Sequence, residues 1–79
     1  MTADEVKKLI VASLPGAKAE VTDSRGTGDH FSAVVEWDGF KGLSLVEQHR
    51  TVYAALGETL TREVHALELK TLAPGQGGN

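Results

Sequence analysis

Apolar side chains recur every three or four residues at the start of the chain: Val6, Leu9, Ile10 and Leu14. This spacing is typical of a helix with one buried face. Thr2 and Glu5 have the spacing of a capping box, in which each side chain accepts the other residue's backbone N–H, and Pro15 ends the run. The pattern predicts a first helix over about residues 2–14.

The spacing then changes from helical to alternating. One apolar set comprises Ala17, Ala19 and Val21, and the other comprises Phe31, Ala33, Val35 and Trp37. Alternation of apolar and polar residues indicates strands with one buried face. The glycine-rich segment 24–29 between the two sets is longer than a two-residue turn. These features predict a hairpin with strands over about 17–23 and 30–37, joined by a flexible loop.

The second half of the chain predicts two helices and a closing strand. Ser44 and Glu47 form another capping box, which precedes apolar residues at helical spacing: Leu45, Val46, Val52, Tyr53 and Leu56. The pattern predicts a helix over about 44–56. Residues 58–62 can form a short third helix, and residues 64–72, rich in Leu and Val, predict the closing strand.

The predicted order αββααβ places the chain in the α+β class. The hairpin and the third strand form a three-stranded sheet, and the helices cover one face of it. With 79 residues the chain is long enough for one small domain only. We expect this domain to occupy residues 1–73, and residues 74–79, which have nothing to bury, to form a flexible tail.

Composition and charge narrow the possible functions. The chain has no Cys, so it cannot form a disulfide or supply a thiolate to zinc or an iron–sulfur cluster. Its 8 Lys and Arg face 11 Asp and Glu, and neither half is basic, which disfavours a general nucleic-acid binder. The longest apolar run, residues 9–12, is far shorter than the about 20 residues that cross a bilayer, so we expect a cytoplasmic protein.

Three histidines are the candidate nitrogen ligands. His49 lies on the apolar side of the predicted second helix, and we interpret it as a partly covered, hydrogen-bonded residue at the edge of the core. His30 ends the hairpin loop, and we expect its side chain to be accessible on the face opposite Phe31. His65 opens the closing strand, where core packing and metal ligation are equally compatible with its position.

No familiar catalytic constellation is complete in the sequence. Ser32 lacks a base and an orienting acid, and Ser44 is explained as a helix cap. Residues 39–42 spell G-x-x-G, which clamps a nucleic-acid backbone in KH domains, but here the motif lies between a strand and a helix. Residues 26–28 could cradle an anion through backbone amides, but they lead into a strand rather than a helix.

Four segments in this order and spacing resemble the BolA family: GDHF at 28–31, FKGLSLV at 40–46, HRTVYAAL at 49–56 and VHALELKTLAP at 64–74. Together they extend the resemblance over nearly the whole chain. The resemblance implies a KH-like (type II) α+β fold without the KH clamp, which agrees with the position of the G-x-x-G motif.

The resemblance also implies a function. BolA-like proteins are partners of monothiol glutaredoxins and form heterodimers that can share a [2Fe–2S] cluster in iron–sulfur trafficking and iron sensing. We therefore expect an adaptor rather than an enzyme, a cluster shared with glutaredoxin and glutathione, and none in the isolated chain, which is a monomer or weak dimer. His65 matches the family's histidine at the head of the last strand and is the expected metal ligand.

The second ligand departs from the family pattern. Many members place Cys or His within the hairpin loop, but the loop 23–29 contains neither, and the Cys position of some relatives falls near Thr27. His30, at the end of the loop, is therefore the second candidate metal ligand. A heterodimer with a single ligand from this chain, or without a cluster, is the alternative.

Two other functions remain open at this point. Some BolA proteins are DNA-binding, stress-linked transcriptional regulators, and Lys41, Arg50 and Arg62 would have to form the local basic patch. The chain could instead bind another protein without metal, through an exposed apolar patch around Trp37 and Phe40, although Trp37 also fits the core.

Overall fold

The computed structural model describes residues 1–59 and 66–74. Its elements are helix α1 (Ala3–Ser13), strands β1 (Lys18–Asp23) and β2 (His30–Glu36), helix α2 (Leu45–Leu56) and strand β3 (Ala66–Leu72). These bounds confirm the predicted helices, hairpin and closing strand to within two residues. The predicted third helix over 58–62 extends outside the described residues, as does most of the predicted tail. No helix in the described ranges has the length and apolar content needed to cross a membrane.

Both long helices begin where the sequence predicts. The Glu5 N–H donates to Thr2 Oγ1 at 3.1 Å, and the Thr2 N–H donates to Glu5 Oε1 at 2.8 Å. Ser44 and Glu47 make the same pair of hydrogen bonds at the start of α2, at 2.9 and 3.2 Å. Each capping box satisfies backbone N–H groups that have no partner within the helix.

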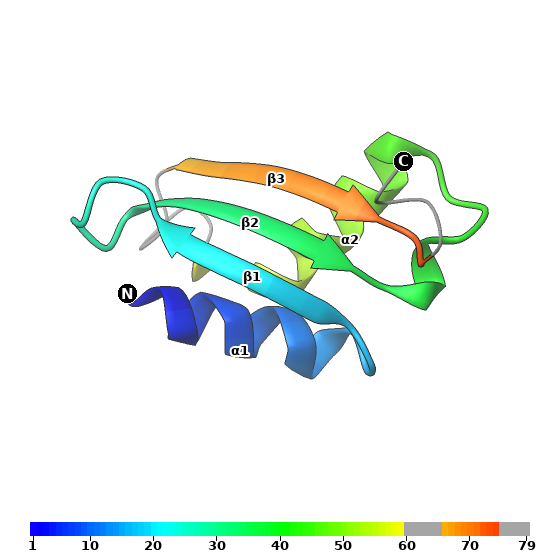
Figure 1. The fold of residues 1–79 in the computed structure, drawn as a ribbon, viewed down its shortest axis with the longest axis horizontal. Coiled ribbons are helices and arrows are strands. Elements are labelled where there is room, and N and C mark those ends of the chain that lie inside the picture. The colour runs from blue at the N-terminus through cyan, green and yellow to red at the C-terminus, as the bar shows by residue number, and fades with distance from the viewer. Residues whose placement is uncertain (60–65, 75–79) are drawn as a thin grey trace.

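The sheet has the order β1-β2-β3, with β2 in the centre (Figure 1). β1 pairs with β2 antiparallel, which confirms the hairpin, and β2 pairs with β3 parallel. The connection through α2 accounts for the parallel pairing, since parallel strands need a crossover and a helix provides one. As a result β2 and β3 begin at the same end of the sheet (Figure 1).

One hydrophobic core joins the helices to one face of the sheet. Its fully buried side chains come from α1, β2 and α2 and from the turn after β2: Val6, Ile10, Phe31, Val35, Phe40 and Val52. The apolar residues predicted for α2 do not all reach this core. Val52 and Leu56 are buried, but Leu45 and Val46 are 62% and 59% exposed. They occupy the first turn of α2, so helical spacing alone did not separate them from the core.

The alternative of a metal-free protein-binding module requires an exposed apolar patch around Trp37 and Phe40, and the structure contradicts it. Phe40 is 1% exposed and meets the Trp37 ring edge to face, with ring centroids 5.4 Å apart. The Trp37 Nε1–H donates to the Pro15 carbonyl at 2.9 Å. A Cβ on Gly39 would lie 2.5 Å from the Trp37 ring, so the first glycine of the G-x-x-G motif makes room for the indole. The motif therefore serves packing between β2 and α2.

Candidate functional site

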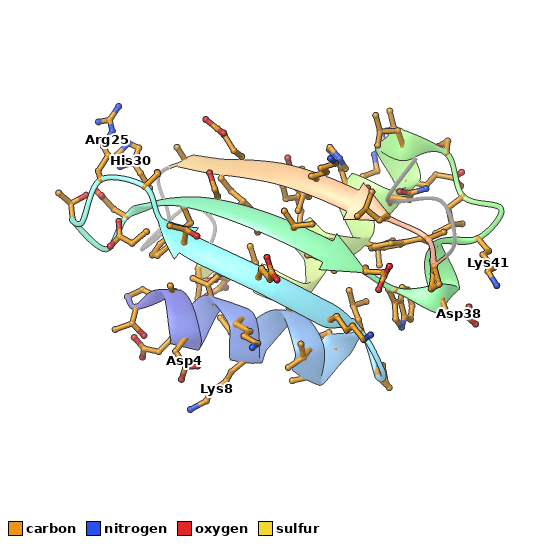
Figure 2. The ribbon with its side chains drawn as sticks, viewed as in Figure 1. Asp4, Lys8, Arg25, His30, Asp38 and Lys41 are labelled. Atoms are coloured by element: carbon orange, nitrogen blue, oxygen red, sulfur yellow. The ribbon has the colours of Figure 1, made fainter. Side chains whose placement is uncertain are left out.

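His30 lies at the end of the sheet where β2 and β3 both begin (Figure 2). It is the register partner of Ala66, and the Ala66 N–H donates to the Asp29 carbonyl at 3.2 Å. The end of the hairpin loop is thereby joined to the head of β3. His65, the first candidate ligand, directly precedes Ala66 in the sequence but lies outside the described residues, so its role stays a prediction.

The His30 side chain is held by its neighbour in the sequence. His30 Nδ1 lies 2.8 Å from Asp29 Oδ1, and the Thr27 hydroxyl donates to the same carboxylate oxygen. His30 projects away from the buried Phe31, as predicted, but its side chain is only 24% exposed. It is thus more covered than expected, because it rests against the loop rather than extending into solvent.

The loop between β1 and β2 is organised around Asp23. The Asp23 carboxylate accepts backbone N–H groups from Arg25, Gly26 and Gly28, at 3.3, 2.8 and 2.8 Å. Both glycines have positive φ, of 72° and 78°, a conformation that side chains disfavour. A backbone cradle for an anion, disfavoured from the sequence because the segment leads into a strand, is therefore present, but the chain's own carboxylate fills it. The expectation of a merely flexible loop missed this arrangement.

This cradle changes the acidity of Asp23. Desolvation acts to raise the pKa of the Asp23 carboxyl, but the N–H groups of Gly28 and Gly26, with smaller contributions from Arg25 and Thr27, outweigh it and lower the pKa below its ordinary 3.8. A carboxyl group whose pKa is lower in the folded than in the unfolded state stabilises the folded state at pH values above its ordinary pKa. The contribution is lost as the pH falls through the lowered pKa.

We expect the amide proton shifts of Gly26 and Gly28 to titrate together in wild-type protein, with a midpoint below 3.8. NMR of the 15N-labelled chain over this acidic range measures the midpoint. In an Asp23→Asn variant the titration should vanish while the amides of β3 keep their shifts. A midpoint at or above 3.8, or a titration that survives the substitution, contradicts the cradle.

His49 is partly covered at the edge of the core, as predicted. Its ring meets the Tyr53 ring edge to face, with centroids 6.3 Å apart. Its buried Nε2 has no hydrogen-bond partner within the described part of the chain, so the predicted hydrogen bond is not found at that atom. The contact with Tyr53 accounts for the orientation of the His49 ring, and this contact gives no indication that His49 binds a metal.

The structure describes two of the three cations that the DNA-binding alternative would require, and one of them is already paired with a carboxylate. Lys41 pairs with Asp38 at 3.1 Å, at the opposite end of the sheet from His30 (Figure 2). Arg50 is exposed on α2, where its charge lowers the pKa of Glu47 after the larger effect of the hydrogen bonds from Ser44. Arg62 lies outside the described residues.

Among the described residues, the His30 end of the sheet offers one imidazole, with the Asp29 carboxylate beside it. Residues 1–59 and 66–74 contain no group of three or more His, Cys, Asp or Glu placed to hold a metal ion. A shallow groove of about 530 Å³ opens along α1, β1 and β2, without a histidine or hydroxyl nucleophile, and its charged lining residues are Lys7, Lys18, Glu20 and Glu36. The described part can therefore offer a nitrogen ligand to a partner, but not a complete metal site.

A family model and individual relatives both show which known proteins this chain is similar to. The sequence model for BolA-like proteins matches residues 6–76. The uncharacterized protein RP812 of Rickettsia prowazekii is 34% identical over 73 residues, which cover 92% of this chain and 95% of that protein. BolA-like protein 1 of Pongo abelii is 42% identical over 53 residues, 67% of this chain but only 39% of that longer protein.

The chain is also similar to a transcriptional regulator and to a protein of known structure. The DNA-binding transcriptional regulator BolA of Escherichia coli K12 is 31% identical over 78 residues, which cover 90% of this chain and 74% of that protein. The crystal structure of a bol-like protein from Babesia bovis superposes with a TM-score of 0.83 at 26% identity and covers 95% of this chain and 87% of that one. The fold is thus the one seen in such proteins.

Proposed function

The chain belongs to the BolA-like protein family, and from this membership we propose that it is an adaptor for a monothiol glutaredoxin in iron–sulfur cluster trafficking or iron homeostasis. In this role it contributes histidine nitrogen to a [2Fe–2S] cluster held at the boundary with its partner. The pairing of His30 with Ala66 carries the proposal, because it joins the loop histidine to the strand that His65 precedes.

The donor set of the chain suits a shared cluster. Without Cys it has no thiolate, so the sulfur ligands would come from the glutaredoxin and glutathione. His65 and His30 would supply the imidazole. Replacement of thiolate by imidazole raises the reduction potential of such a cluster and adds a ligand that protonation can release. The Asp29 carboxylate beside His30 Nδ1 resembles the outer-shell partners that orient metal-binding histidines.

The proposed role is binding rather than catalysis. The named relatives are BolA-like proteins and transcriptional regulators, and none is named as an enzyme among those described above. The hydroxyl of Ser44 caps α2, and that of Ser32 approaches Glu68 at 3.5 Å instead of a histidine. Neither serine is thus placed as an activated nucleophile.

DNA-binding regulation is the second candidate. The name of the Escherichia coli relative favours it. The net charge of −3 argues against it, since Lys and Arg contacts to phosphate supply most non-specific affinity for DNA. The ion pair between Lys41 and Asp38 further reduces the local positive charge.

Titration with a monothiol glutaredoxin, glutathione, iron and sulfide under anaerobic conditions tests the adaptor role. We expect a 1:1 heterodimer whose absorption and circular-dichroism spectra differ from those of the glutaredoxin homodimer. A spectrum identical to that of the homodimer at every ratio contradicts the proposal. Duplex DNA binding by the isolated chain that weakens steeply with salt would favour the regulator instead.

A further inference from the structure

We infer that Asp29 is a positioning residue that holds His30 as the tautomer with its proton on Nδ1, and so presents Nε2 as the nitrogen for ligation. The inference deepens the proposed function, on which its second half rests. The tautomer itself is a property of the isolated chain, and it can be measured without iron or glutaredoxin.

The geometry fixes the direction of the hydrogen bond. An ionised carboxylate can only accept, so a ring nitrogen 2.8 Å from Asp29 Oδ1 must carry the proton. In the neutral ring the lone pair then lies on Nε2. A ring nitrogen must be unprotonated to bind a metal ion, so this tautomer gives His30 the form that ligation through Nε2 requires.

Asp29 is itself held at two points. The Thr27 hydroxyl donates to its carboxylate, and its carbonyl accepts the Ala66 N–H at 3.2 Å. The first contact orients the side chain, and the second fixes the backbone to the head of β3. Thr27 thus orients the carboxylate that holds His30.

The effect of such a carboxylate is known in general terms. Outer-shell carboxylates fix the tautomer and ring orientation of ligating histidines and increase their basicity, and their loss typically costs about 10- to 100-fold in metal affinity. His49 provides the internal contrast. Its ring meets the Tyr53 ring, and its buried Nε2 has no hydrogen-bond partner in the described part of the chain, so no carboxylate selects a tautomer at that atom.

NMR of the histidine ring nitrogens in the 15N-labelled chain at neutral pH tests the inference. In wild-type protein we expect His30 to show the Nδ1–H tautomer. Asp29→Ala should move both His30 nitrogens toward a mixture of tautomers, whereas Asp29→Asn should largely retain the wild-type pattern, because its amide oxygen still accepts from Nδ1–H. Asp38→Ala, which removes a surface carboxylate at the other end of the sheet, is the matched control.

An Nε2–H tautomer or an imidazolium in wild-type protein, or unchanged His30 shifts in a folded Asp29→Ala variant, overturns the inference. The backbone amide spectrum shows whether that variant is folded. If Asp29→Ala unfolds the chain, Thr27→Val reports on the same carboxylate, and we expect a smaller shift in the same direction.

A second arm connects the tautomer to ligation. With glutaredoxin, glutathione, iron and sulfide, the Asp29→Ala substitution alone should reduce the difference between the heterodimer spectrum and that of the glutaredoxin homodimer. Added to His30→Ala, it should cause no further reduction. An effect that persists without His30 overturns the positioning role. Failure of the proposed function is distinguishable, because wild-type protein would then show the tautomer but form no heterodimer.

Discussion

A Phe31→Ala variant is expected to lose about 3–5 kcal/mol of unfolding free energy, since truncation of a buried Phe leaves a cavity as well as lost apolar contact. Phe31 is 1% exposed, lies on the central strand β2, and belongs to the cluster that joins both helices to the sheet. Natural domains are stable by only about 5–15 kcal/mol. The substitution should therefore leave a substantial unfolded population.

Urea unfolding followed by circular dichroism measures this loss. Val34→Ala, three residues further along β2, is the matched control, because Val34 lies on the open face of the sheet and is 37% exposed. We expect it to cost about 1 kcal/mol or less. Equal losses for the two variants would contradict the assignment of buried and open faces in β2.

Much of the fold could be predicted because two local signals agree with the global structure. The change from helical to alternating spacing locates α1, β1 and β2, and each capping box fixes the first turn of a helix. The parallel pairing of β3 follows from the crossover through α2. The spacing and the capping boxes depend on residues close in sequence, so a pattern suffices to find them, whereas the parallel pairing joins distant segments and was not among the predictions.

The burial of single residues was less predictable. Leu45 and Val46 fit the helical pattern of α2 but remain exposed, whereas Phe40, which one alternative placed in an exposed patch, is buried. Which end of a helix reaches the core, and where a turn folds back, depends on contacts between distant segments. The Trp37 indole, for example, is fixed by the Pro15 carbonyl, which lies before β1.

The candidate site shows the same division. The sequence identified His30 and His65, but it did not reveal that Asp29 and Thr27 hold the His30 ring. An Asp directly before a His at the end of a loop was the available signal. Asp23 was missed for a similar reason, since its three backbone partners converge only once the two glycines adopt positive φ.

His65→Ala has the largest expected effect on function. The resemblance to BolA proteins makes His65 the first candidate ligand, and its place directly before Ala66 puts it next in sequence to the residue paired with His30. We expect the variant to abolish the difference between the heterodimer spectrum and that of the glutaredoxin homodimer. His30→Ala should diminish the difference without removing it, because it would take away only the second ligand.

Loss of ligation must be distinguished from loss of folding. Truncation of a histidine side chain costs about 1–2 kcal/mol, which a domain of ordinary stability tolerates, so His65→Ala should unfold cooperatively in urea at a slightly lower midpoint. His49→Ala, which removes a partly covered histidine from α2, is the matched control and should keep the full heterodimer spectrum. A folded His65→Ala protein that also keeps the full spectrum would show that this imidazole does not ligate the cluster, and His30 would then be the remaining nitrogen donor to examine.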